Sequence, residues 1–99
     1  MLEKIRDEIE LIKRHLLVAR AVLEHEPIGI IKLSEVLGQP QHRIRYSLRI
    51  LEQMGYIRAS PLGAYATPEM REMLSGVPDE LDACIRALQE MREGQMNNL

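Results

Sequence analysis

The sequence predicts a mainly α-helical chain that carries one short β-hairpin and has extended helices at both ends. Three segments, residues 1–25, 32–54 and 68–91, repeat apolar side chains at spacings of three and four residues, which is the period of an amphipathic helix. Between the last two segments, residues 56–67 hold two short strand-like stretches around a turn with proline and glycine. A length of 99 residues with 45% hydrophobic content suits a single domain over residues 1–99.

The first predicted element is one continuous helix over residues 1–25. Pro27 disfavours the helical conformation at the residue before it, so we expect the helix to end near His25. Such a helix is about 36 Å long at ~1.5 Å per residue, roughly twice what a small core needs. We therefore expect its N-terminal half to project from the core with uncovered apolar side chains that bind a second copy of the chain. The apolar positions have heptad spacing: Leu2, Ile5, Ile9, Ile12, Leu16, Ala19 and Leu23.

A short helix, a tight turn and a longer helix are predicted next. Residues 28–31 form a β-branched apolar run, which predicts a small first strand. Three apolar residues on one face predict a short helix over residues 32–37, and Gly38 provides the turn after it. Pro40 opens the longer helix, over residues 40–54, because its missing N–H costs nothing in a first turn. The buried stripe of this helix is expected to consist of Ile44, Leu48 and Leu51.

The longer helix leads into the predicted hairpin. Gly55 is placed to end the helix, and residues 56–59 and 64–67 are expected to be the two strands. The turn between them, residues 60–63, has proline in second and glycine in fourth position, which is typical of a type I turn. The order of helix, turn, helix and hairpin over residues 32–67 is the outline of a winged helix-turn-helix, in which the hairpin is the wing.

Two helices are predicted over residues 68–95. Thr67 before Pro68 is a good helix start, with the threonine hydroxyl as N-cap and proline in the first turn. We expect Ser75-Gly76 to interrupt this helix and Pro78 to begin the second one. The apolar stripe of the second helix is Leu81, Cys84, Ile85, Leu88 and Met91. The single cysteine in this stripe, Cys84, is expected to be a small buried apolar residue.

The formal net charge of −2 is unevenly distributed along the chain. Residues 1–31 carry a net −1 and residues 59–99 a net −4, whereas residues 32–58 carry +3. A locally basic surface inside an acidic protein is what binding to nucleic acid requires.

The hydrogen-bond donors of this basic segment are concentrated on one helix. The outer face of the helix over 40–54 is predicted to lie in a DNA major groove. Arg58 is the only cation of the wing, so a minor-groove contact there would be small. For the arginines the other interpretation is a solvated helix face. His42 either reaches a phosphate or base edge or is a plain exposed histidine, and Tyr46 either stacks on a sugar or covers the helix. The candidate DNA-binding residues are Lys32, Gln41, His42, Arg43, Arg45, Tyr46, Arg49 and Arg58.

Other function classes find little support in the sequence. The acidic residues near Asp79 and Glu24 fit helix-start acids and solvated faces, and no nucleophile stands beside a base, so we expect no enzyme activity. The three histidines are not spaced as metal ligands, and we expect no metal or cofactor. No apolar run approaches the ~20 residues of a membrane span, and the N-terminus is charged rather than signal-like. We therefore expect a cytoplasmic protein without membrane contact.

The segment IIKLSEVLGQPQHRIRYSLRILEQMGYIRASPLGAYAT resembles the winged helix-turn-helix transcriptional regulators of archaea and bacteria, the compact dimeric archaeal ones in particular. The similar pattern covers about residues 16–67, and its strongest part, Ile44-x3-Leu48-x2-Leu51-x3-Gly55-Tyr56-Ile57, looks like a recognition helix that continues into the first wing strand. The resemblance implies sequence-specific binding of double-stranded DNA by a homodimeric transcriptional regulator. The short, nearly uncharged wing tip and the acidic overall charge depart from the family pattern.

Two hypotheses therefore stand side by side. The first is the dimeric DNA-binding regulator, with the first 25 residues and the C-terminal helices as dimerisation elements. The alternative is a winged-helix module that binds another protein without reading DNA. Ile50 lies outside the buried stripe of its helix, and its exposure would favour this alternative. The expected dimer interface consists of Leu2, Ile5, Ile9, Ile12, Leu81, Ile85, Leu88 and Met91.

Overall fold

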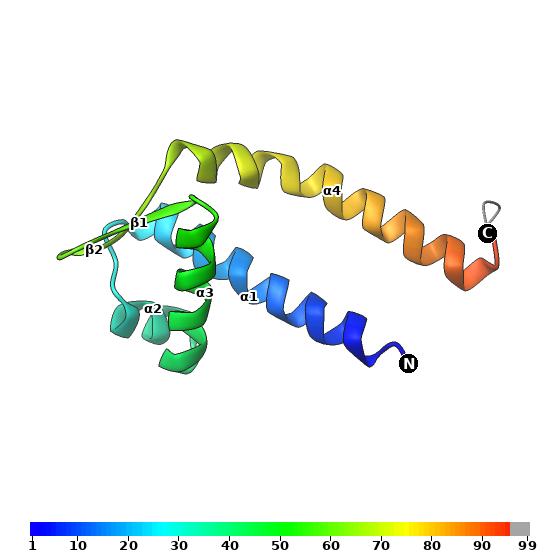
Figure 1. Cartoon of the computed structure of the whole chain (residues 1–99), viewed down its shortest axis with the longest axis horizontal. Helices are drawn as coiled ribbons and strands as arrows, with labels where there is room; N and C mark the ends of the chain where they lie inside the picture. The colour runs from blue at the N-terminus through cyan, green and yellow to red at the C-terminus, as the bar shows by residue number, and fades with distance from the viewer. Residues whose placement is uncertain (96–99) are drawn as a thin grey trace.

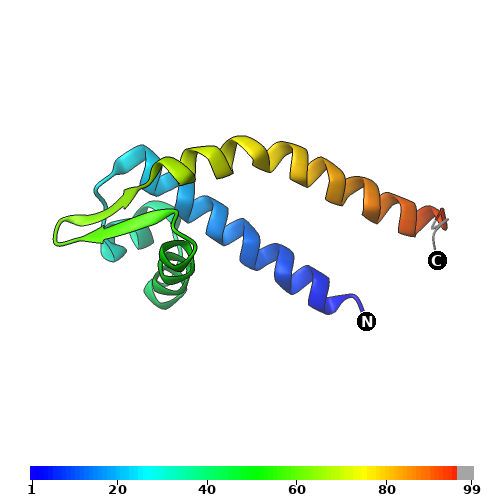
Figure 2. The ribbon, with the colours of Figure 1, turned by 45° about the horizontal axis from the view of Figure 1, so that its top comes forward.

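The computed structural model describes residues 1–95 and is mainly helical, with one two-stranded antiparallel hairpin, as the sequence predicted. The elements are, in order, α1 (Glu3–His25), α2 (Ile30–Leu37), α3 (Gln41–Gln53), β1 (Ile57–Ser60), β2 (Gly63–Ala66) and α4 (Pro68–Glu93) (Figure 1). The molecule is elongated, with extents of 52 × 27 × 20 Å. α2, α3 and the hairpin gather at one end, and the outer halves of α1 and α4 extend away from them as two arms (Figures 1 and 2).

The C-terminal half of α1 is the centre of the core. Val18, Ala19 and Val22 are fully buried, whereas every residue from 1 to 10 is exposed. The helix ends at His25, where the sequence predicted its end, because Glu26 before Pro27 leaves the helical conformation. The residues that pack around α1 come from every other element: Ile28, Leu33, Ile44, Leu51, Ile57, Ala64 and Met70.

The strand expected over residues 28–31 is wrong. Only Ile28 pairs with another strand: its N–H donates to the Ala64 carbonyl at 3.2 Å, and the Ala64 N–H donates to the Ile28 carbonyl at 2.8 Å. Leu33 N donates to the Gly29 carbonyl at 3.0 Å, which starts α2 at Ile30. A short apolar run fits a strand and the start of a buried helix equally well, and here the backbone hydrogen bonds of the helix prevail.

α2 and α3 are joined by a tight connection. Gly38 adopts the left-handed conformation, with φ of 62°, and its N–H donates to the Ser34 carbonyl. Pro40 is extended and forms the N-cap of α3, so it precedes the helix rather than occupying its first turn. Ile44 and Leu51 are buried and Leu48 is partly buried, which confirms the predicted stripe.

The hairpin pairs Ile57 with Ala66 and Ser60 with Gly63 in antiparallel register. Its strands therefore lie one residue away from the predicted 56–59 and 64–67. Ser60 Oγ donates to the Gly63 carbonyl at 2.7 Å and accepts from Leu62 N at 3.2 Å, which stabilises the tight turn.

The interruption expected at Ser75-Gly76 is wrong, because α4 is a single helix of 26 residues (Figure 2). Thr67 caps it as predicted: its hydroxyl accepts from Met70 N at 3.3 Å. Met70 and Val77, seven residues apart, are both buried and hold the helix against the core on either side of the glycine. Pro78 is exposed, so the Leu74 carbonyl that loses its helical partner can be hydrated.

The continuity of α4 also changes the surroundings of Cys84. The thiol was expected to be buried, but Cys84 is exposed because residues 78–93 leave the core instead of folding back on it. Among residues 1–95, no helix combines the length and the apolar character needed to cross a membrane.

Candidate functional site

All eight residues predicted to contact DNA are exposed. They lie on α2, α3 and β1 at the end of the molecule opposite the arms. None of the eight residues is therefore explained by a buried salt bridge or by packing in the core.

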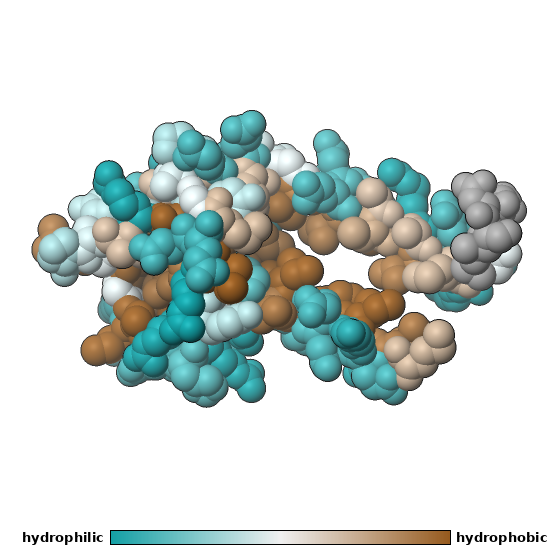
Figure 3. Space-filling model, viewed as in Figure 1, coloured by the Kyte–Doolittle hydropathy of each residue, from teal (hydrophilic) through white to brown (hydrophobic). Residues whose placement is uncertain are grey.

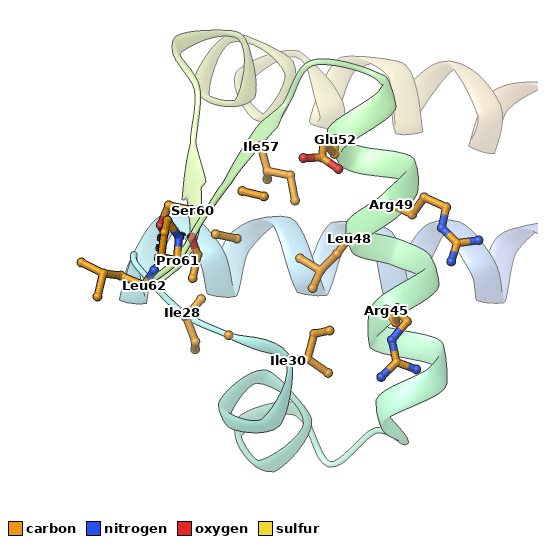
Figure 4. Close-up of a pocket in the computed structure, with 14 residues that line it drawn as sticks. Ile28, Ile30, Arg45, Leu48, Arg49, Glu52, Ile57, Ser60, Pro61 and Leu62 are labelled. Atoms are coloured by element: carbon orange, nitrogen blue, oxygen red, sulfur yellow. Dashed lines mark hydrogen bonds between the residues drawn. The ribbon is translucent and has the colours of Figure 1, made fainter.

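Arg45 and Arg49 share one side of α3, beside the hairpin. They lie at the edge of a groove of about 520 Å³ between α3 and the hairpin, which we call the hairpin groove. Figure 4 shows Leu48 and Ile57 pointing into the groove, whereas the Arg49 guanidinium points away from the hairpin and the Arg45 guanidinium lies in front of α3. Both cations are thus presented to a partner that approaches α3 from outside.

Arg45 also belongs to a second, open groove between α2 and α3, of about 590 Å³. Lys32 and Gln41 line the same groove, so Arg45 is shared by two grooves. The cations that line these two grooves are Lys32, Arg45 and Arg49, here called the basic row. Lys32 Nζ is 3.8 Å from Glu35 Oε2, with both side chains largely exposed. An exposed pair of this kind contributes little and leaves the lysine able to bind another anion.

Tyr46 and Arg43 lie on a different side of α3. The Tyr46 ring is tilted against the His15 ring of α1, with 5.9 Å between ring centroids. Arg43 and Arg45 are two residues apart, which at ~3.6 residues per turn places them roughly 160° apart around the helix. The α3 residues expected to form one DNA-facing surface therefore do not all share one side: Arg45 and Arg49 adjoin the hairpin, whereas Arg43 and Tyr46 do not.

A polar cluster that the sequence analysis missed joins α1 to α3. Ser47 is fully buried, and its Oγ accepts from Arg14 Nε at 3.3 Å and lies 2.8 Å from His15 Nδ1. Burial, and then the positive charge of Arg14, lower the pKa of His15, while Glu8 opposes this shift. A neutral imidazole can accept a hydrogen bond from the Ser47 hydroxyl at Nδ1. The signal was present in the sequence, because Ser47 is spaced three from Ile44 and four from Leu51 on the buried face.

The hairpin offers one cation, as predicted. Arg58 and Tyr65 are cross-strand partners, and the guanidinium carbon lies 5.5 Å from the centre of the tyrosine ring. The stacking orients Arg58 along the hairpin. The tip itself carries Leu62, which is 75% exposed, and no charge.

A second surface lies between the arms. An open groove of about 720 Å³ lies between the outer half of α1 and the C-terminal half of α4. We call it the arm groove. Figure 3 shows hydrophobic side chains facing the gap between the arms. Of the expected dimer residues, Ile5, Ile9, Ile12, Leu81 and Leu88 line the arm groove; Leu2, Ile85 and Met91 are exposed outside it.

Within residues 1–95, no three His, Cys, Asp or Glu side chains are grouped so that they could hold a metal ion. The two candidate surfaces are therefore an exposed basic row on α2 and α3 and an apolar groove between the arms. A scan against models of known protein families finds no match, and a search of curated proteins finds no similar sequence.

Proposed function

We propose that this protein binds double-stranded DNA sequence-specifically and regulates transcription as a homodimer. In this proposal α2, α3 and the hairpin are a winged helix-turn-helix, and α3 lies in the major groove as the recognition helix. The observation that carries the proposal is the basic segment: residues 32–58 have a net charge of +3 in a chain of net charge −2, and all their cations are exposed.

The shape of α3 fits this role. Its 13 residues are about 20 Å long at ~1.5 Å per residue, and a major groove about 12 Å wide admits a single helix. Arg45 and Arg49 form no salt bridge within residues 1–95, so both keep their full donor capacity for bases or phosphates.

We propose different roles for the residues of the basic row. Arg45 lies between the hairpin groove and the α2–α3 groove, in the middle of the row, where it reads bases through a bidentate contact to guanine. Arg49 and Lys32 are at the ends of the row and hold phosphates. Tyr46 and Arg43, on the α1 side of α3, contribute less.

The test is a binding titration of alanine variants over a series of salt concentrations. The two duplexes are the preferred site, selected from a randomised library, and a scrambled version of it. Arg45→Ala is expected to lose about 1–3 kcal/mol on the preferred site and little on the scrambled duplex. Arg49→Ala is expected to weaken both duplexes alike and to lower the magnitude of the salt slope by about one unit.

Arg71→Ala is the matched control, because Arg71 is also an exposed arginine but lies on α4, outside the basic row. It should bind both duplexes as the unmutated protein does. If none of the alanine variants at positions 43, 45 and 49 loses affinity for either duplex, α3 does not bind DNA.

A second candidate is a protein-binding module that uses the same end of the molecule. It is favoured by two apolar side chains beside the basic row: Ile31 is 64% exposed and Leu62 is 75% exposed. Ile50 gives less support than the sequence suggested, because it is partly buried. Affinity for mixed-sequence duplex DNA at two salt concentrations separates the candidates, since a DNA-binding protein binds this duplex with an affinity that falls as salt rises, whereas a protein-binding module does not bind it.

A further inference from the structure

The apolar stripes of both arms continue stripes that are buried in the core. On α4 the heptad positions are Met70, Leu74, Val77, Leu81, Cys84, Leu88 and Met91; the first three are buried or partly buried, and the last four are exposed. On α1 the pattern is the same in reverse, with the exposed positions at the N-terminal end. One unbroken stripe therefore passes from a covered to an uncovered environment on each helix, which indicates that the outer part is also covered in solution.

The two arms do not cover each other. They diverge from the core (Figures 1 and 2), and Ile9 and Leu88 remain 43% and 41% exposed although both line the arm groove. The groove is open rather than enclosed, so a further helix can enter between the arms.

We propose that a second copy of this chain fills the arm groove, so that the four arms of two protomers form a four-helix bundle. Two helices with one apolar stripe each cannot enclose a core, whereas four such helices close around one. In the bundle each α1 lies between its own α4 and the α4 of the partner.

The amount of apolar surface agrees with a dimer. The area follows from the free energy of burying one apolar side chain, divided by the free energy gained per Å² of apolar surface. Eight arm side chains that are each about half exposed offer on the order of 250–500 Å² of apolar surface per protomer. A standard interface buries about 800 Å² per partner, of which somewhat more than half is apolar. The arms thus supply most of the apolar part that a stable dimer needs.

The position and charge of the arm residues favour a second copy over a small apolar ligand. Leu2, Ile85 and Met91 are exposed outside the groove, where a ligand in the groove would not reach them. The charged lining of the groove comes from α1, with Lys4, Lys13 and Glu8. Residues 78–93 of α4 carry five acidic and two basic side chains, so the α4 of the partner meets α1 with complementary charge.

The inference does not depend on DNA binding, and its test uses no DNA. Light scattering of the whole protein at micromolar concentration should give twice the chain mass of 11.4 kDa. Ile9→Glu and Leu88→Glu should each give the mass of one chain and keep the helical circular-dichroism signal, because the core begins at Val18 and does not include either residue.

Leu62→Glu is the matched control, since it places the same charge at an exposed leucine on the hairpin tip, and it should remain a dimer. A single-chain mass for the unmutated protein would overturn the proposal. This holds even if the monomer binds an apolar dye in the arm groove, because the groove would then take a small ligand rather than a second copy. A dimer that dissociates with Leu62→Glu but persists with Ile9→Glu would overturn it as well.

Cys84 provides a measurement that does not depend on how well a variant folds. The thiol lines the arm groove and is the single cysteine of the chain, so its reaction with a maleimide reports on the groove alone. The reaction should slow at least tenfold as the protein concentration is raised through the dimerisation range. A rate independent of concentration and equal to that of the unfolded chain would show that the groove stays open.

Discussion

Replacing Gly63 with alanine should destabilise the fold, because two segments of backbone meet at this residue. Gly63 has φ of +129°, which a residue with a side chain adopts only at a cost of about 1–3 kcal/mol. A Cβ atom would also lie 2.6–2.8 Å from the backbone C, N and O atoms of Ile28. Backbone cannot rotate away as a flexible side chain can, so the hairpin must separate from the segment before α2.

The separation removes the two hydrogen bonds between Ile28 and Ala64, each contributing about 0.5–1.5 kcal/mol. Strain and separation partly relieve each other, so the expected loss is about 2–4 kcal/mol rather than the full sum. For a domain of this size that corresponds to a fall in Tm of roughly 10–30 °C.

Thermal unfolding followed by circular dichroism measures the change, with all proteins at one concentration because the Tm of any self-associating protein depends on its concentration. Gly76→Ala is the control: a Cβ atom at Gly76 meets nothing within 4 Å, and Gly76 lies inside α4. This substitution should stabilise the fold by about 0.5–1 kcal/mol. An unchanged Tm for Gly63→Ala would refute the close approach of the two backbones, and a lower Tm for Gly76→Ala would mean that α4 is interrupted there.

Three further predictions concern the cap of α4, the partly buried His15 and the proposed DNA site. Thr67→Ala should lower the free energy of unfolding by about 0.5–2 kcal/mol, because the hydroxyl accepts from Met70 N and also donates to the Gly55 carbonyl; Thr67→Ser should keep most of it, and equal denaturant midpoints for both variants would contradict this. The pKa of His15 is lowered in the folded chain, so as the pH falls the unfolded chain binds a proton at His15 before the folded chain does. The stability present above the ordinary pKa of 6.5 should therefore be lost as the pH falls through the lowered pKa. His15→Gln should flatten this part of the pH profile, and identical profiles for the unmutated protein and this variant would exclude the effect. If the dimer presents both copies of α3 on one face, footprinting should show two inverted half-sites about 34 Å, or one DNA turn, apart, and protection of a single half-site would contradict that arrangement.

Features that depend on a few neighbouring residues could be predicted from the sequence. Gly38 ends α2, Thr67 caps α4 and Pro27 limits α1, because each acts through the backbone within about one helical turn. The turn at residues 60–63 belongs to the same class.

The predictions that were wrong concern segments whose local sequence fits two different structures. The apolar run of residues 28–31 fits a strand or a helix start, and hydrogen bonds from Leu33 to Gly29 and from Ile28 to Ala64 divide it between the two. Gly76 weakens a helix, yet the burial of Met70 and Val77 on one face keeps α4 continuous across it. The exposure of Cys84 follows from that continuity.

The candidate site was predicted by residue type but not by arrangement. The basic segment of residues 32–58 and its exposure follow from the sequence alone, since charged side chains avoid the core. The arrangement around α3 depends on what packs beside the helix: Tyr46 lies against His15, whereas Arg45 and Arg49 lie beside the hairpin.

The helical period of α1, α3 and α4, the hairpin turn and the uneven charge could be predicted, because they are properties of spacing and composition. The unbroken course of α4, the hydrogen bonds that join Ser47 of α3 to α1, and the open groove between the two apolar stripes became visible only in the folded chain. These features depend on which distant surfaces meet, and contacts between residues far apart in the chain leave no fixed spacing in the sequence.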